Sequence, residues 1–199
     1  MELTTKIIQE LREKTGVGMM DCKKALTEAG GDMEKAEELL RKQGLAAIAR
    51  RAGRTAAQGT IDSYIHIGGK IGVLVEINCE TDFVARNIEF QSFVKDIAMQ
   101  IAASNPQYID RGEVPDGVVD HEREILKGQT LAEGKPEKVA DKIVDGRLEK
   151  FYSEVCLLDQ PFIKDPKKTI KDLLGEFAGK IGENIVIRRF TRYQLGEKS

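Results

Sequence analysis

Two stretches of alternating apolar residues on either side of Gly68-Gly69 constrain the fold of this chain more than any other feature. Isoleucines alternate with polar residues from Gly59 to the two glycines, and the same period of two continues from Ile71 to Cys79. This period is typical of β-strands, and a Gly-Gly pair suits a two-residue hairpin turn. The sequence therefore predicts a β-hairpin over residues 59–79.

The first 44 residues have a helical period instead, with glycines between the helices. Apolar residues spaced by three or four predict three short helices, with Asp32 as the N-cap of the third and with Gly16 and Gly44 ending the first and third. Three short helices of this kind can bury their apolar stripes only against one another. Residues 1–44 are therefore predicted to form a three-helix bundle of the ubiquitin-associated-like kind.

Two neighbouring methionines in the second of these helices face different ways. At about 100° per residue, Met19 shares a face with Cys22 and Leu26, whereas Met20 points to nearly the opposite side. We expect Met19 in the core of the bundle and Met20 on its surface.

Residues 45–58 are rich in alanine and include Arg50, Arg51 and Arg54. They predict a linker that is partly helical. Basic side chains in a linker can touch phosphates, but this composition favours a solvated tether.

The core domain, residues 59–199, continues with a helix from about residue 87 that ends before Pro106. A further helix over 169–180 leads into a last strand over 184–193. Together with the hairpin, these elements predict an α+β fold in which helices cover one face of a three-stranded, mostly antiparallel sheet.

Residues 107–160 differ from the rest of the core domain in composition, because they are rich in charged residues and contain glycines at intervals. Two helical segments in this region predict an antiparallel helical arm, about residues 112–158, inserted into the core domain. Pro136 suits the first position of the second segment. Because the apolar positions of that segment change face along its length, we expect a bend near Gly146.

Charge and composition narrow the range of functions. The chain has 31 Lys+Arg against 33 Asp+Glu, so it has no overall attraction to nucleic acid or to an anionic membrane. It has no apolar run near the roughly 20 residues that span a bilayer, and its first residues lack the order of a signal peptide. Three cysteines far apart, Cys22, Cys79 and Cys156, favour reduced core thiols in a cytoplasmic protein.

The sequence lacks the motifs of nucleotide binding and catalysis. The Gly-Gly-Lys and Ala-Gly-Lys triplets that end at Lys70 and Lys180 do not have the spacing of a phosphate-binding loop. There is no Gly-x-Ser-x-Gly turn, and His66 and His121 are too far apart in sequence to suggest a metal cluster. We therefore expect neither a cofactor nor an enzymatic reaction.

Three arginines and one histidine each allow two interpretations. Arg188, Arg189 and Arg192 could bind RNA or pair with acidic helices, and the lack of an aromatic stripe beside them favours ion pairs. His66, near the hairpin turn, is either an ordinary surface histidine or a contact for a partner.

The segment Thr81-Asp82-Phe83-Val84 places two apolar residues in a connection, where polar residues are expected. In one interpretation Thr81 or Asp82 caps a helix and Phe83 is tucked into the core. In the other, Phe83 is an exposed aromatic residue beside a carboxylate, held on a rigid strand end for insertion into a partner. The residue pattern leaves both open.

Four segments resemble bacterial translation elongation factor Ts: LREKTGVGMMDCKKALTEAGGD (11–32), EINCETDFVAR (76–86), QPF (160–162) and KIGENIVIRRF (180–190). The resemblance runs in collinear order over essentially the whole chain. It implies a guanine-nucleotide exchange factor that binds elongation factor Tu, in its GDP-bound and nucleotide-free forms, and accelerates the loss of GDP. It implies no direct contact with nucleic acid or membrane.

The resemblance also implies roles for particular residues. Thr81–Val84 match a family segment that is associated with dislodging the magnesium ion of elongation factor Tu. Phe83 is the implied wedge, and Asp82 would bind the displaced elements without ligating the metal.

Further partner contacts are implied in two other places. The N-terminal domain of the family grips the GTPase domain, which points to exposed Met20, with Met19 beside it. His66 lies in a strand segment similar to the part of the family core that meets another domain of the partner.

Longer family members have two related core halves, whereas this chain has length for one. A single half implies a noncovalent homodimer that recreates the paired core and forms a two-to-two complex with elongation factor Tu. Two other classes of function remain possible from the sequence. A ubiquitin-like-binding adaptor rests on the helical bundle alone, and an RNA-binding module rests on the arginines.

Overall fold

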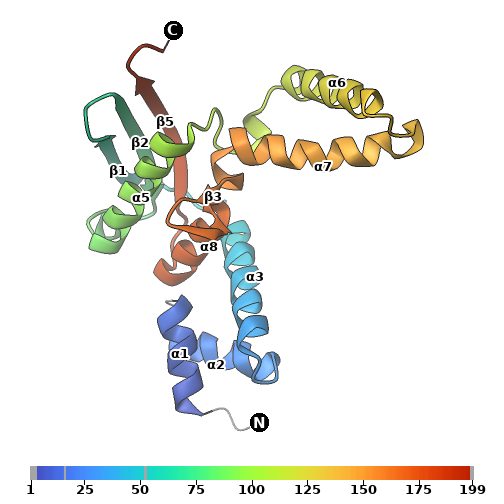
Figure 1. Cartoon of the computed structure of the whole chain (residues 1–199). Helices are drawn as coiled ribbons and strands as arrows, with labels where there is room; N and C mark the ends of the chain where they lie inside the picture. The colour runs from blue at the N-terminus through green and yellow to red at the C-terminus, as the bar shows by residue number, and fades with distance from the viewer. Residues whose placement is uncertain (1–3, 16, 52, 198–199) are drawn as a thin grey trace.

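The computed structural model describes residues 4–15, 17–51 and 53–197, and over residues 45–51 it describes the course of the backbone only. It has the predicted α+β architecture, with helices at the N-terminus, a three-stranded antiparallel sheet and further helices (Figure 1). The boundaries expected at residues 44 and 58 stay a prediction.

The N-terminal bundle consists of α1 (Thr5–Thr15), α2 (Met19–Glu28) and α3 (Met33–Arg51). Its apolar stripes pack together as predicted, and Asp32 caps α3 by accepting a hydrogen bond from the Lys35 amide at 3.1 Å. Gly16, expected to end the first helix, lies outside the described residues. The buried residues of the bundle are Ile8, Leu11, Cys22, Ala25, Leu26, Ala36 and Leu40.

The sequence pattern predicted that the third helix ends at Gly44, and this was wrong, because the helix continues to Arg51. Gly44 lies where α3 crosses another helix, and not at the end of α3. A Cβ on Gly44 would lie 3.2 Å from the carbonyl oxygen of Gly175 in α8 (Ile170–Ile181), so the missing side chain lets the two helices approach closely. The first half of the predicted linker is therefore helical, in line with its alanine content.

The three-stranded sheet has the order β1 (Gln58–Ile65), β2 (Ile71–Cys79), β5 (Val186–Gln194). Both neighbouring pairs are antiparallel. Ile65 pairs with Gly72, so the connection is centred on Gly68-Gly69, but it is longer than the predicted two-residue turn. The Gly69 amide donates to the His66 carbonyl oxygen at 2.9 Å, which makes Ile67 and Gly68 the central residues of the turn. Both turn glycines have a positive φ, a conformation that glycine adopts without strain.

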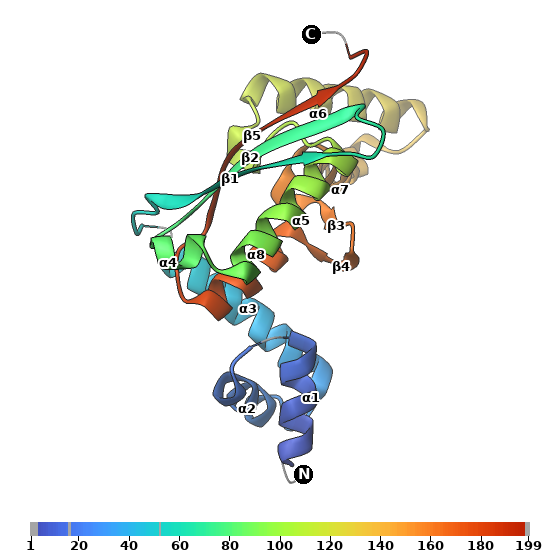
Figure 2. The same cartoon turned by 90° about the vertical axis from the view of Figure 1, so that its left-hand side faces the viewer.

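One face of the sheet is covered by α5 (Ile88–Ser104), as Figure 2 shows. Alternate side chains of β2 pack against this helix, so the expected covering of one face is confirmed. Phe177 of α8 adds to the same core by stacking on Phe93, with 4.6 Å between the ring centroids. The buried residues of this core include Val73, Val75, Ile77, Cys79, Phe90, Val94, Ile97 and Ile101.

A second, two-stranded sheet was not predicted from the sequence. It pairs β3 (Pro161–Phe162) with β4 (Asp165–Thr169) beside α8. A strand of two residues is too short to show an alternating pattern. The second strand leads directly into α8, which begins with a capping box between Thr169 and Asp172.

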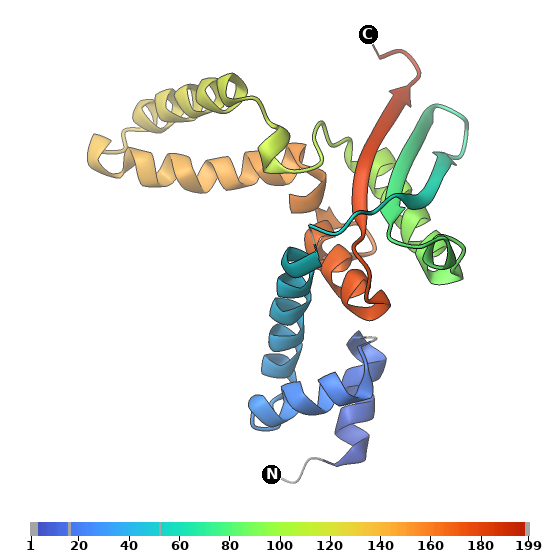
Figure 3. The same ribbon diagram turned by 180° about the vertical axis from the view of Figure 1, so that it is seen from behind.

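The predicted arm consists of α6 (Asp116–Ala132) and α7 (Glu137–Val155), which pack against each other and project from the core (Figures 1 and 3). We expected a bend near Gly146, but α7 continues through this residue and both figures show it straight. Its buried positions are four residues apart and form one face, so no bend is needed. They are Ala140, Val144 and Leu148. In the described part of the chain, no helix combines the length and the hydropathy needed to cross a membrane.

Polar contacts tie the base of the arm to the core. The Arg111 guanidinium donates to both oxygens of Glu149, at 2.8 and 2.9 Å, and to Asp159 Oδ1 at 2.6 Å. In the interior, the buried amide of Gln100 donates to Gln160 Oε1 at 3.1 Å. Buried polar groups that satisfy one another in this way specify one arrangement of the segments they join.

Candidate functional site

Thr81 to Val84 lie in the turn between β2 and α5. Thr81 caps the short helix α4 (Asp82–Ala85), because its hydroxyl oxygen accepts a hydrogen bond from the Val84 amide at 3.4 Å. The Phe83 ring is 83% exposed, whereas Val84 packs partly against the core of the sheet. The segment is therefore a helix cap, as one interpretation held, but its aromatic ring lies in solvent, as the other held.

Two glutamates join this turn to the connection between α8 and β5. Glu183 Oε2 accepts hydrogen bonds from the amides of Glu80, at 3.0 Å, and Thr81, at 3.1 Å. Glu183 Oε1 accepts a hydrogen bond from the Thr81 hydroxyl at 2.6 Å. In the opposite direction, the Asn184 amide donates to Glu80 Oε1 at 2.6 Å. The turn is thus held by a segment 103 residues further along the chain.

Neighbouring groups add to the rigidity and charge of the turn. The buried Cys79 thiol donates to the Thr81 carbonyl oxygen, with 3.2 Å between sulfur and oxygen. Burial raises the pKa of Cys79 to about 11, and the negative charge of Glu183 contributes to the same direction. Asp82 forms an ion pair with Arg86 at 3.3 Å, which keeps its carboxylate at the surface.

Two residues of this region were not predicted from the sequence. Ile88, the first residue of α5, is 81% exposed and adds a second large apolar side chain to the surface of the connection. The buried stripe of α5 begins at Phe90, so a helical wheel would have placed Ile88 away from it. Glu183 was visible as part of the KIGENIVIRRF segment, but nothing in the sequence pairs it with Thr81.

The other predicted partner contacts lie elsewhere. Met20 is 64% exposed on α2, and Met19 packs against the bundle core, as their spacing predicted. His66 is exposed at the hairpin end, where its Nδ1 lies 3.1 Å from Tyr64 Oη. The nine residues of β2 separate this end from Phe83 by about 30 Å. The structure therefore does not bring the three predicted contacts to one place.

Two of the three arginines near the C-terminus form ion pairs. Arg189 pairs with Glu76 of β2 at 2.7 Å, and the largely buried Arg192 pairs with Glu197 at 3.4 Å. Ion pairing was predicted, but the expected partners were wrong, because these carboxylates come from a strand and from the C-terminal segment and not from helices. A bulge where β5 passes Glu76 leaves Arg188 without a partner residue in the register of the two strands.

The face of the sheet opposite α5 carries exposed apolar side chains. Because Ile65 pairs with Gly72, the isoleucines of β1 share a face with Leu74 and not with the buried valines of β2. Tyr193 of β5 pairs with Gly72 from the other side. Ile65 is 65% exposed, Leu74 48% and Tyr193 72%. We name Ile61, Ile65, Leu74 and Tyr193 the open sheet face.

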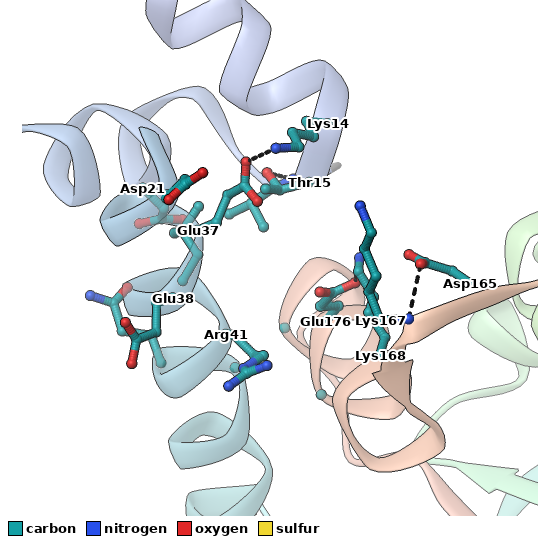
Figure 4. A pocket seen from close by; sticks show the side chains of 17 residues that line it. Lys14, Thr15, Asp21, Glu37, Glu38, Arg41, Asp165, Lys167, Lys168 and Glu176 are labelled. Atoms are coloured by element: carbon teal, nitrogen blue, oxygen red, sulfur yellow. Dashed lines mark hydrogen bonds and ion pairs between the residues drawn. The ribbon is translucent and has the colours of Figure 1, made fainter. Parts of the chain in front are cut away.

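A cleft of about 720 Å³ lies between the N-terminal bundle and the elements α8 and β4 (Figure 4). Opposite charges pair within each wall, Lys14 with Glu37 on the bundle side and Lys168 with Glu176, at 2.7 Å, on the core side. The predicted site residues, all of them described by the structure, do not line it. The cleft is therefore a junction between bundle and core, separate from the candidate site.

Comparison with known proteins identifies the family. The family profile described as "Elongation factor TS" matches residues 1–197. Elongation factor Ts of Thermoanaerobacter pseudethanolicus is 64% identical over 195 residues, which cover 98% of this chain and 96% of that protein. Elongation factor Ts of Acetivibrio thermocellus is 65% identical over 195 residues, which cover 98% of this chain and 91% of that protein. The chain therefore belongs to the elongation factor Ts family and is a translation elongation factor.

Proposed function

We propose that this protein is a guanine-nucleotide exchange factor, which binds elongation factor Tu with GDP and accelerates GDP release by inserting Phe83 beside the magnesium and phosphate site. The observation that carries the proposal is a ring 83% exposed on a turn held by hydrogen bonds. A large apolar side chain on rigid backbone is suited to filling a pocket in a partner. The protein performs no covalent chemistry in this reaction.

The wedge acts on the groups that hold the nucleotide. A GTPase binds its nucleotide through a phosphate-binding loop and a magnesium ion coordinated to phosphate oxygens. A ring inserted between the surrounding elements displaces the groups that position the metal, and this weakens GDP binding. Asp82, next to Phe83 in α4, would pair with displaced polar groups of the partner in exchange for its ion pair with Arg86.

The coupling between GDP binding and binding of the exchange factor determines how large the contact with elongation factor Tu must be. The free energy by which the factor weakens GDP binding equals the free energy by which GDP weakens binding of the factor. A weakening of about 10⁴-fold corresponds to about 5.5 kcal/mol. Burial of one phenylalanine supplies about 1.5–3 kcal/mol, so a broad second contact is needed. Exposed Met20 on the bundle and His66 at the hairpin end are the proposed contributors.

The open sheet face supports a noncovalent homodimer as part of this proposal. An exposed apolar patch with a polar border is typical of an interaction surface, and here the Glu76–Arg189 ion pair lies on the same face. In a twofold dimer the same patch is used by both chains. Two chains joined in this way would form a two-to-two complex with elongation factor Tu.

Release of labelled GDP from elongation factor Tu, with and without this protein, tests the proposed function. We expect a large acceleration, and equal release rates would contradict the proposal. A ubiquitin-like-binding adaptor predicts binding without faster release. An RNA-binding module predicts salt-sensitive binding to RNA, for which the ion-paired Arg189 and Arg192 give no support.

A further inference from the structure

We propose that Glu183 is a positioning residue for nucleotide exchange, whose carboxylate holds the Thr81–Val84 turn in the geometry that presents Phe83 to the GTPase. The inference rests on the proposed function. It concerns a residue from a distant part of the chain, in the connection between α8 and β5.

Glu183 accepts the hydrogen bonds that begin the turn. Because β2 ends at Cys79, the amides of Glu80 and Thr81 lie beyond the strand, and both donate to Glu183 Oε2. The Thr81 hydroxyl donates to Glu183 Oε1, and its oxygen still has lone pairs to accept the Val84 amide. One carboxylate therefore orients both the backbone before α4 and the hydroxyl that caps α4.

The contact is reciprocal, which fixes the distance between the two segments. Glu80 Oε1 accepts a hydrogen bond from the Asn184 amide at 2.6 Å. The Asn184 side chain in turn donates to the Arg54 carbonyl oxygen at 2.9 Å. Hydrogen bonds from backbone amides to an ionised carboxylate are stronger than bonds between neutral groups. The turn and the α8–β5 connection are therefore held as one unit.

Phe83 depends on this backbone support. Since its ring is 83% exposed, packing does little to fix its position, and the turn must do so. A ring that must first be ordered on binding loses part of its binding free energy to that ordering. A ring that the free protein already holds in the binding geometry avoids this loss. Loss of the Glu183 carboxylate should therefore weaken exchange without removing any group that touches the partner's nucleotide site.

The variants are Glu183→Ala, Glu183→Gln and the control Glu124→Ala. Alanine removes both acceptor oxygens. Glutamine keeps the length of the side chain, and its carbonyl oxygen can accept both backbone amides while its amino group donates to the Thr81 hydroxyl. Glu124 is an exposed glutamate of α6, so its substitution controls for the loss of one negative charge.

Residue-resolved hydrogen exchange in the isolated protein reports the contact itself. In Glu183→Ala, the amides of Glu80 and Thr81 should exchange at least about tenfold faster, while the amide of Val75 in the middle of β2 keeps its protection. Glu183→Gln should restore slow exchange. Unchanged exchange at both amides would overturn the inference.

A double-mutant cycle with Phe83→Ala separates positioning from stability. At saturating factor, Glu183→Ala should lower the maximal rate of GDP release about tenfold, with the half-saturating concentration within about twofold of wild type. In a Phe83→Ala background the same substitution should cause no further loss, because Glu183 acts through the ring. A merely structural role would raise the half-saturating concentration and would act equally in both backgrounds.

The outcomes distinguish this inference from the proposed function. If Phe83→Ala slows exchange but Glu183→Ala keeps the wild-type maximal rate, or acts equally in both backgrounds, the inference fails and the proposed function stands. If Phe83→Ala exchanges GDP at the wild-type rate, the proposed function fails and the inference with it. Should Glu183→Ala not fold, Glu183→Asp enters the same cycle, because its shorter side chain cannot span the turn.

Discussion

Gly44 of α3 lies against the backbone of Gly175 in α8, so that a Cβ on Gly44 would stand 3.2 Å from the Gly175 carbonyl oxygen. The contact is part of the crossing of the two helices. Arg41, one turn before Gly44, adds an ion pair to Asp172 of α8 at 3.7 Å. Through this crossing, α3 joins the N-terminal bundle to the core.

A side chain at Gly44 should disrupt this crossing. We expect Gly44→Val to lower the free energy of unfolding by about 1–3 kcal/mol, because the new methyl groups meet backbone that cannot move aside. Gly128→Ala in α6 is the matched control: its Cβ meets no atom within 4 Å, and it should stabilise the protein by about 0.5–1 kcal/mol. Urea unfolding measures both. A Gly44→Val protein as stable as wild type would show that the helices do not cross this closely.

The Arg111 network at the base of the arm should make stability depend on pH. Its hydrogen bonds to Glu149 hold the pKa of that carboxyl below the ordinary value of 4.5. A lowered folded-state pKa contributes stability above the unfolded pKa, and this contribution is lost as the pH falls through the folded pKa. Arg111→Met should therefore cost about 1 kcal/mol at pH 7, with the difference from wild type shrinking below about pH 4.5.

The control for this prediction is Arg123→Met on the same arm. Arg123 makes a single exposed ion pair with Asp145 at 2.8 Å, and its loss should cost at most about 0.5 kcal/mol. Thermal unfolding followed from pH 7 to pH 3 compares the two variants. A difference between wild type and Arg111→Met that stays constant over this range would contradict the assigned role of Glu149.

Local periodicity accounts for the parts of the fold that were predicted correctly. The alternating residues of β2 and the helical stripe from Phe90 to Ile101 are each buried against one side of the core. The apolar period within each segment is therefore enough to predict its secondary structure and its buried face. The role of Gly44 at a helix crossing involves Gly175, 131 positions away, and no local pattern contains that partner. The β3–β4 pair was not predicted for a different reason: β3 has two residues, and two residues cannot show a period.

The candidate site was predictable to a lesser degree. Phe83 stood out because an aromatic residue in a connection needs an explanation, but its pattern fitted a buried ring as well as an exposed one. Its exposure is decided by the cap at Thr81 and by the contact of that residue with Glu183, 102 positions away. The open sheet face was not predicted; it depends on the register of the hairpin, which places Ile65 on the same face as Leu74 and not with the buried strand positions.

The buried thiols should be unreactive in the folded protein. Burial raises the pKa of both Cys79 and Cys156 to about 11, so only about one thiol in a thousand is ionised at pH 8. Both side chains are also inaccessible to reagents. Alkylation with iodoacetamide at pH 8, read by mass spectrometry, should modify them only after unfolding in guanidinium. Equal rates in the folded and unfolded protein would contradict this burial.

The proposed dimer should depend on the open sheet face. A charge in the middle of an apolar interface is costly to bury, so Leu74→Arg should convert the dimer to a single chain of 22.1 kDa. Ile125→Arg, at an exposed position of α6, should leave the dimer intact. Light scattering at micromolar concentration reads the mass. A wild-type protein with the mass of one chain would remove the dimer from the account.

The most direct measurement of the central claim is GDP release from elongation factor Tu driven by Phe83→Ala, compared with wild type and with Ile125→Ala as a surface control. Loss of a buried ring contact of about 1.5–3 kcal/mol should lower the rate at least about tenfold. The unfolding temperature should stay at the wild-type value, because the ring is 83% exposed in the free protein. Exchange at the wild-type rate, or a variant that melts well below wild type, would contradict the account.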